Sequence, residues 1–275
     1  MGQLKGAIPG LIIANIIFFA VTYGLPDMQE PMFRALALYF PQHPDFKPWQ
    51  FISNMFMHGG FTHILFNMYA LWAFGTPLAL IWGKNKFLAF YFLSGIGAGV
   101  IYILVNYFQF NMIYNEVLAQ GISPNQIQDL FELSRQEMSS LLNTTNYTRS
   151  VFAGVPRERL MDLYTLYSVP AVGASGAIYG VLVAFGVLFP NSKLMLIFFP
   201  FPIAAKYFIP VLIAIDLFSG VTGFSIFGSG IAHFGHVGGA LIGFLLMLYF
   251  RKHSRIPPRV DRNEDQTERG IQSDI

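Results

Sequence analysis

Long apolar segments separated by short polar stretches make up most of the chain. A helix needs about 20 apolar residues to cross the hydrocarbon core of a bilayer, and most of these segments approach or reach that length. The pattern predicts an all-α, polytopic membrane protein, a bundle of six transmembrane helices. We place the spans at about residues 7–23, 61–82, 87–108, 172–189, 207–218 and 231–250.

The first and fifth spans need a further argument. The first follows Lys5 and has no clear small-x-small cleavage site, so we expect a retained span and not a removed signal peptide. The fifth is short, because Pro200 and Pro202 interrupt the apolar pattern before it.

Basic residues indicate the orientation of the spans. They lie between spans two and three at residues 84–86, after span four at Lys193, and after span six in residues 251–255. Because Lys and Arg are enriched in cytoplasmic loops, we expect both termini on the cytoplasmic side and the loops after spans one, three and five outside. Residues 251–275 are expected to form a disordered, polar cytoplasmic tail behind a membrane domain of residues 1–250.

The outward segment at about residues 111–171 is long for a connection between spans. Ser123-Pro124, with Gln126 three residues after the serine, is typical of a helix start, and a second helix is expected at residues 156–167. Charged residues interrupt both, so we predict a helical insertion that is interfacial or packed on the spans. We hypothesise that it covers or shapes the access route to a site on this side.

Composition supports a membrane protein and excludes some chemistry. The chain is 54% hydrophobic and only 12% charged, whereas soluble domains carry about a quarter charged residues. The net charge of +2 is too weak to indicate a nucleic-acid partner, so membrane lipid is the expected surrounding. With no cysteine, disulfides, thiol nucleophiles and thiolate metal sites are excluded. The sequence does not specify an oligomeric state.

The stretch from residue 172 to residue 180 carries the candidate nucleophile. Ser175 stands among small residues at the head of the fourth span, and Tyr179 follows it at i+4. Gly176 and Gly180 have the same spacing, so each pair lies on one side of a helix. Because a small-xxx-small pair lets the backbone of another helix come close, the serine is presented beside a surface suited to tight packing.

Span six carries matching glycines and a histidine. His236, Gly239 and Gly243 stand at i, i+3 and i+7 and form one stripe. If these glycines meet those of span four, the imidazole of His236 lies at the depth of Ser175 and can take the proton of its hydroxyl. These parts suffice for a serine hydrolase without a third triad residue. His233 is an alternative base, but the glycine spacing favours His236 and leaves His233 as a water-facing neighbour.

Span two supplies a second set of polar residues. His63 and Asn67 are four residues apart and share one inward face near the outer end, with His58 just upstream. Polar side chains at membrane depth are costly and suggest a function, although hydrogen bonds between helices are a simpler role. Both residues could donate to a developing oxyanion, as could the backbone N–H of Ser175 at a helix start.

Two other classes fit parts of the pattern. A metal site at His233 and His236 lacks a His-Glu-x-x-His pattern and a nearby carboxylate, so no metal or organic cofactor is expected. A transporter could use Asp216 in span five, but a single membrane carboxylate without repeat symmetry is weak evidence for a transporter. A polar contact, or a position at the watery end of the span, also explains this aspartate.

Taken together, the motifs of spans four and six resemble those of the rhomboid family of intramembrane serine proteases. Gly173-Ala-Ser175-Gly176 is similar to the family's Gly-x-Ser-x nucleophile motif. Tyr179 matches the tyrosine that packs on the catalytic histidine. His236, with glycines three and seven residues later, is similar to the family's histidine-glycine motif.

The resemblance extends to span two and to the first outward loop. His63 and Asn67 match the family's oxyanion pair, with His58 at the upstream position. Trp49 matches the first residue of the family's Trp-Arg motif, but Gln50 stands where the arginine usually follows. The outward insertion is also longer than in minimal bacterial members.

The resemblance implies a rhomboid-like bundle that cleaves peptide bonds in or beside transmembrane segments of membrane-protein substrates. Ser175 and His236 would form the catalytic dyad, with Gly173 and Tyr179 in support. The expected location is the cell membrane, in particular a bacterial inner membrane, with the site opening to the outer side. An inactive rhomboid-like binding protein is the alternative, and a small transporter is a further one.

Overall fold

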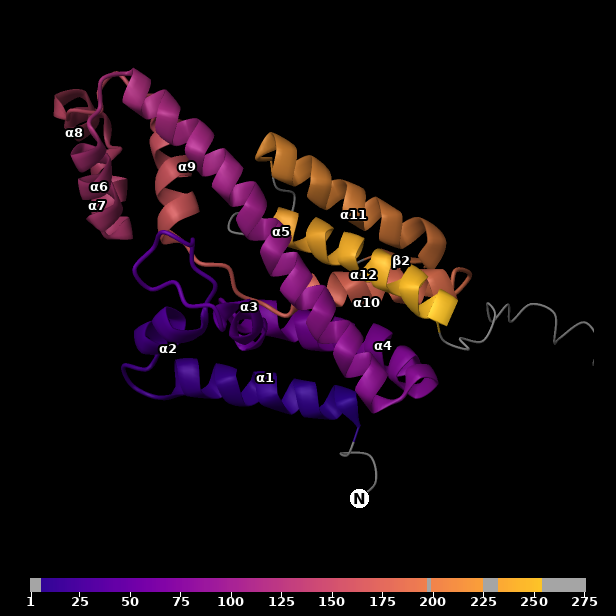
Figure 1. Cartoon of the computed structure of the whole chain (residues 1–275). Coiled ribbons are helices and arrows are strands. Elements are labelled where there is room, and N and C mark those ends of the chain that lie inside the picture. The colour runs from indigo at the N-terminus through magenta and orange to yellow at the C-terminus, as the bar shows by residue number, and fades with distance from the viewer. Residues whose placement is uncertain (1–5, 197–198, 225–231, 254–275) are drawn as a thin grey trace, which may run out of the picture.

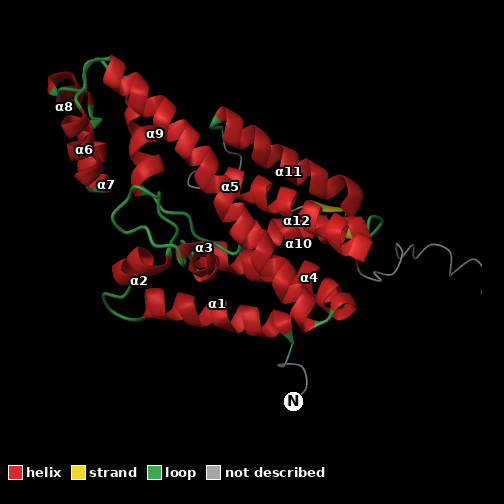
Figure 2. Ribbon diagram, in the orientation of Figure 1, coloured by secondary structure: helices red, strands yellow, loops and turns green. Residues whose placement is uncertain are grey.

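The computed structural model describes residues 6–196, 199–224 and 232–253, and most of these residues are helical (Figures 1 and 2). The helices are α1 (Ala7–Gly24), α2 (Gln29–Leu36), α3 (Gln50–Ser53), a 3₁₀ turn (Asn54–Phe56), α4 (Phe61–Trp82), α5 (Lys84–Ala119), α6 (Pro124–Glu132), α7 (Arg135–Leu141), α8 (Thr144–Arg149), α9 (Arg157–Ser168), α10 (Ser175–Leu188), α11 (Ala205–Thr222) and α12 (His233–His253). Strands β1 (Lys193–Leu196) and β2 (Phe199–Ala204) form one antiparallel hairpin, with Lys193 opposite Ala204.

Five of the described helices, α1, α4, α5, α11 and α12, are long and apolar enough to cross a membrane. Side chains such as Leu80 and Val221, 81% and 71% exposed, face outward from them, as expected for contact with lipid. The predicted all-α polytopic membrane bundle is therefore confirmed. The hairpin was not predicted; it occupies the proline-rich stretch before α11, where a helix cannot continue.

The predicted fourth span, α10, is the exception in length. Its 14 residues extend about 21 Å, less than the roughly 30 Å of a hydrocarbon core. It lies in the middle of the bundle, in contact with α4, α5 and α12. At least one end of this helix must therefore lie within the thickness of the membrane, enclosed by longer neighbours.

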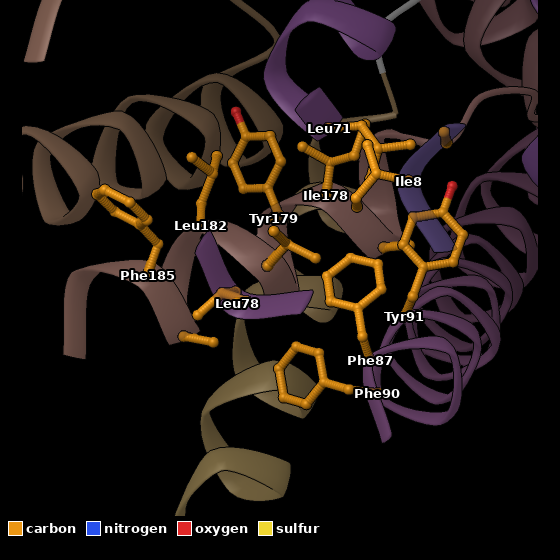
Figure 3. Packing of buried hydrophobic residues seen from close by; sticks show 14 of the residues in the cluster. Ile8, Leu71, Leu78, Phe87, Phe90, Tyr91, Ile178, Tyr179, Leu182 and Phe185 are labelled. Atoms are coloured by element: carbon orange, nitrogen blue, oxygen red, sulfur yellow. The ribbon is translucent and has the colours of Figure 1, made fainter. Parts of the chain in front are cut away.

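The main hydrophobic core surrounds α10, where helices from both halves of the chain converge (Figure 3). Ile8 of α1, Leu71 of α4, Phe87 of α5 and Ile178 of α10 belong to this cluster, and none is more than 4% exposed. Because lipid is as apolar as these side chains, dense packing and not exclusion from water holds them together.

Helices α10 and α12 touch through their glycine faces. A Cβ atom added at Gly239 would lie 1.9 Å from the carbonyl oxygen of Gly176, and one added at Gly243 would lie 2.3 Å from the Cα atom of Gly180. No side chain fits between the two backbones at these positions. The glycines of the two spans therefore meet as their spacing predicted.

Helix α5 is much longer than the predicted third span. It ends at Ala119, whereas the predicted span ended at residue 108. Its 36 residues extend about 54 Å, so one part projects beyond the hydrocarbon core. Figure 1 shows α6, α7 and α8 gathered beside the far end of α5, while α9 returns toward the bundle. The predicted helix start at Ser123 is present, with a reciprocal capping box between Ser123 and Gln126.

The insertion has its own hydrophobic cluster, separate from the main core. Val117, Ile127 and Leu160 are fully buried in it. The same cluster includes Phe40, so the insertion packs on the loop between α2 and α3, where Tyr167 of α9 contacts the Phe40 ring. Its predicted influence on an access route stays a prediction.

The predicted C-terminal tail, residues 251–275, begins inside α12, which runs to His253. From residue 254 onward it lies outside the described residues.

The glycine contact can be tested by overpacking it. Gly243→Ala places a methyl group against the Gly180 backbone, and overpacking of this kind costs about 1–3 kcal/mol of unfolding free energy. Unfolding in detergent, followed by circular dichroism, measures the loss. Gly10→Ala in α1 is the matched control, because no atom lies within 4 Å of the added Cβ. Equal stability of the two variants would contradict a tight contact between α10 and α12.

Candidate active site

Ser175 and His236 face each other across the contact between α10 and α12. Ser175 is the first residue of α10, and His236 lies in the first turn of α12. The Nε2 atom of His236 is 2.8 Å from the Oγ atom of Ser175. Tyr179 stacks on the imidazole, with ring centroids 4.3 Å apart and planes inclined by 14°. The structure thus brings together the three residues singled out on these two spans.

A buried carboxylate from α11 joins this pair. Asp216 is 2% exposed, and its Oδ1 atom lies 3.1 Å from Nδ1 of His236 and 2.6 Å from Nδ1 of His233. The hydroxyl of Tyr179 donates to Oδ2. Because an ionised carboxylate only accepts hydrogen bonds, the Nδ1 atoms of both histidines carry a proton. In the neutral imidazole of His236, Nε2 is then unprotonated, and its lone pair is directed at the serine hydroxyl. A general base requires this tautomer.

The dyad was predicted to suffice without a third triad residue, and the structure adds one candidate, because Asp216 lies on His236 as a triad carboxylate lies on its histidine. Two other sequence predictions need correction. His233 does not face water, since its side chain is 10% exposed and bonded to Asp216. A carboxylate does lie near the two histidines, so that argument against a metal site is wrong. The sequence signal was available, because an acidic residue inside a membrane span is rarely without a role.

His63 and Asn67 of α4 lie on another side of the serine. A Cβ atom added at Gly173 would be 2.8 Å from Nε2 of His63 and 3.5 Å from Oγ of Ser175, so both atoms border the same small space. The Nδ1 atom of His63 accepts from the amide of Gly59 at 3.4 Å, which leaves Nε2 as the N–H donor that faces this space. Asn67 is 7% exposed, and its Nδ2 has no hydrogen-bond partner among the described residues.

An unpartnered buried donor costs about 1–3 kcal/mol, so a group that accepts from Asn67 would be stabilised. Ser175 begins α10, and the amide of a first helical residue has no carbonyl one turn earlier within its helix. The Nε2 atom of His63 and the Ser175 amide are therefore two donors beside the nucleophile, and the unpartnered Asn67 lies one helical turn from His63 on α4. This arrangement is suited to an oxyanion.

Gly173 and His58 support this side of the site. Gly173 has φ +127°, which disfavours any residue with a Cβ atom, and its missing side chain leaves the space occupied by the tip of His63. His58 is 1% exposed and packs edge-on against His63, with ring centroids 5.0 Å apart. Burial lowers the pKa of His58 to about 3, and nearby His63 acts in the same direction. His58 is therefore a neutral packing partner.

A small cavity adjoins the nucleophile. Its volume is about 30 Å³, and its lining includes Ser175, Gly176, His236, Ala98 and Tyr102. This is room for about one water molecule.

The loop between α2 and α3, together with the 3₁₀ turn after α3, holds the chain that leads to Ser175. Ala171 and Leu38 exchange backbone hydrogen bonds at 2.8 and 2.9 Å, and the amide of Gly173 donates to the carbonyl of Asn54 at 2.9 Å. Fully buried Gln50 organises this loop. Its Oε1 accepts from the amides of Tyr39 and Lys47, while its Nε2 donates to the carbonyls of Arg34 and Asp45. Gln50 therefore has a complete structural role where the family usually has arginine. Trp49 is 55% exposed and donates to the carbonyl of Ala35.

These observations define a class: a multi-pass helical membrane protein with a serine, two histidines and a carboxylate in one hydrogen-bonded network inside the bundle. The Rhomboid domain model matches residues 45–124 and 136–253, and the chain belongs to the Rhomboid family.

Relatives with this family's name cover much of the chain. It is 26% identical over 245 residues, 88% of its length, to the presenilin-associated rhomboid-like protein, mitochondrial, of Homo sapiens. It is also 26% identical to rhomboid protein 1, mitochondrial, of Saccharomyces cerevisiae over 73% of its length, and to the rhomboid protease AarA of Providencia stuartii over 74%. These alignments cover 48%, 41% and 56% of the relatives, so the chain spans about half the length of the curated relatives it matches.

The role of Gln50 leads to a prediction. Gln50→Ala removes four hydrogen bonds and leaves buried backbone groups without partners, so the unfolding free energy should fall by about 2–4 kcal/mol. Thermal unfolding in detergent measures this loss. Gln42→Ala is the control, because this side chain is exposed on the same loop. A melting temperature of Gln50→Ala equal to that of Gln42→Ala would show that the loop does not depend on Gln50.

Proposed function

We propose that this chain is an intramembrane serine endopeptidase that hydrolyses peptide bonds in or next to transmembrane segments of other membrane proteins. The observation that carries the proposal is the 2.8 Å contact between Ser175 Oγ and His236 Nε2, with Asp216 on the opposite nitrogen. Membership of the Rhomboid family and the likeness to a relative named as a protease support it.

In the first step, Oγ of Ser175 attacks the carbonyl carbon of the substrate while its proton moves to Nε2 of His236. The imidazolium that forms is stabilised by Asp216, which stays ionised. The new oxyanion accepts hydrogen bonds from His63, Asn67 and the amide of Ser175. His236 then gives the proton to the departing amine, and an acyl ester remains on Ser175.

A water molecule completes the reaction. The cavity of about 30 Å³ beside Ser175 and His236 can hold this water next to the base. His236 removes a proton from the water as its oxygen attacks the ester carbonyl, and then returns the proton to Oγ of Ser175. The product leaves as a carboxylate. Inside a bundle, such a water site would keep hydrolysis possible without an open channel.

The substrate must lose local helix structure before it can react. The carbonyls of a membrane helix are hydrogen-bonded within the helix, so the bond to be cut has to unwind next to Ser175. We therefore expect small or helix-destabilising residues near the cleaved bond. The basic residues at 84–86, 193 and 251–255 support cytoplasmic termini and a site that opens to the outer side. The relatives include proteins named as mitochondrial and one from Providencia stuartii, and the expected bacterial inner membrane stays a proposal.

The decisive experiment is labelling with a serine-directed fluorophosphonate. The wild-type protein in detergent should be labelled at one residue, and Ser175→Ala should lose the label. Both Ser175→Ala and His236→Ala should lose cleavage of a single-span model substrate, because neither retains an activated hydroxyl. Ser94→Ala, which removes a buried hydroxyl of α5, is the control and should keep the label. An unlabelled, folded wild-type protein that cleaves nothing would favour the inactive binding protein.

Asp216 separates the protease from a transporter. Asp216→Asn should reduce kcat by about 10²–10⁴ with little change in KM, because the amide no longer fixes the His236 tautomer or stabilises its charged form. Kinetics on the model substrate, together with unfolding curves, distinguish this effect from misfolding. A transporter would instead lose solute flux in Asp216→Asn and be indifferent to Ser175→Ala.

A further inference from the structure

The group formed by Asp216, His233 and His236 has the composition of a metal site. Among the described residues, its three ligand atoms lie within 4.8 Å of one another. The carboxylate oxygen Oδ1 is 2.6 Å from Nδ1 of His233 and 3.1 Å from Nδ1 of His236. Two imidazole nitrogens and one carboxylate oxygen therefore lie close together at the interface of α11 and α12.

We propose that this triad of side chains binds a Zn²⁺ ion, and that the bound ion arrests the catalytic dyad. The inhibitory part rests on the proposed protease function, whereas binding does not. The sequence pattern at His233 and His236 argued against a metal site, because the carboxylate lies on a different helix from the two histidines and no local spacing points to it.

The spacing suits zinc after a small adjustment. Tetrahedral zinc holds nitrogen and oxygen ligands at about 2.0–2.2 Å, which places the ligand atoms roughly 3.3 Å apart. The contacts of 2.6 and 3.1 Å are somewhat shorter, so small rotations of the side chains open the required space. Three protein ligands and one water molecule are a common zinc arrangement, whereas Mg²⁺ and Ca²⁺ prefer oxygen ligands.

The surroundings of the site also favour a metal. The side chains of Asp216, His233 and His236 are only 3%, 10% and 15% exposed, so a bound ion would exchange slowly with solvent. Tyr179 donates to the second carboxylate oxygen and fixes its orientation, as the outer partners of metal ligands do. His233 and His236 are three residues apart in the first turn of α12, so they present their rings on one side of the helix.

The chemistry explains why such an ion would inhibit. In the metal-free site the Nδ1 atom of His236 carries the proton, and Nε2 accepts from Ser175. Zinc binds through the lone pair of an unprotonated nitrogen, so the proton has to leave Nδ1 and occupy Nε2 of the neutral ring. Nε2 then points an N–H at the Oγ atom of Ser175 and cannot take its proton. The same atoms thus serve catalysis or metal binding, but not both.

Binding is tested first, without any reliance on activity. The Ser175→Ala protein in detergent is titrated with Zn²⁺ by calorimetry, and with Co²⁺ as a visible-absorbing substitute. We expect one site per chain, weakened at least tenfold by His233→Asn and by Asp216→Asn. His43→Asn is the matched control, because His43 and Asp45 form the other histidine–aspartate pair of the described chain, with 4.0 Å between Nδ1 and Oδ2. Zinc binding that survives both site variants, or that is lost in His43→Asn, would overturn the site.

Inhibition is tested second, on the active protein. Zn²⁺ should abolish cleavage of the model substrate, a chelator should restore it, and the same concentration of Mg²⁺ should have no effect. In His233→Asn the zinc concentration that halves the remaining rate should rise at least tenfold, whatever the basal rate. Cleavage that persists with the site saturated would refute arrest of the dyad. A wild-type protein that never cleaves would refute the proposed protease, while the titration still decides the metal site.

Discussion

The contact of the α10 and α12 backbones is the constraint on which the site depends. Gly176 and Gly239 touch without any side chain between them, and Gly180 and Gly243 repeat the contact one turn further along. Ser175 immediately precedes the first of these glycines, and His236 is three residues before its partner. Since the rise and twist of each helix are fixed, this backbone contact sets the separation of hydroxyl and imidazole. Any bulk added at the glycines would push the two reactive groups apart.

A second constraint is the buried charge of Asp216. A carboxylate inside a membrane bundle is costly unless hydrogen bonds satisfy it. Tyr179, His233 and His236 each contribute one contact, so the carboxylate connects α10, α11 and α12. This arrangement gives α11, otherwise mostly exposed along its length, a specific attachment to the two central helices. The network that orients His236 also holds α10, α11 and α12 together.

The sequence was sufficient for most of the fold, because each membrane-crossing helix is a long apolar segment with its own signal. It was also sufficient to bring Ser175 and His236 together, because glycine spacing reports which faces of two helices can touch. The part of α5 beyond residue 108 was missed, because polar residues such as Asn111 and Glu116 interrupt the apolar pattern there, while Phe110 and Val117 are buried by the insertion. Hydropathy cannot separate burial by lipid from burial by protein.

The partners of Asp216 were not predicted, although a polar contact was among the roles considered for it. These partners are 17, 20 and 37 residues away in sequence, so no local spacing joins them. Gln50 is a related case, because its hydrogen bonds include two to residues 11 and 16 positions before it and close a loop of irregular backbone. The hydrogen-bond partners of a polar residue that belongs to no periodic pattern are decided by the tertiary structure alone. Sequence reasoning can say that such a residue needs partners, but not which ones.

The two halves of the site are therefore fixed by different physics. On the side of α12, contact of the glycine backbones sets the distance from Ser175 to His236. This distance does not depend on hydrogen bonds. On the other side, the chain at residues 169–174 is held through Leu38 of the loop between α2 and α3 and through Asn54 of the 3₁₀ turn, and Gln50 holds that loop in turn. The insertion packs on the same loop, where Tyr167 of α9 contacts Phe40. A change in this loop or in the insertion should thus move the chain that precedes Ser175, while the contact between Ser175 and His236 stays in place.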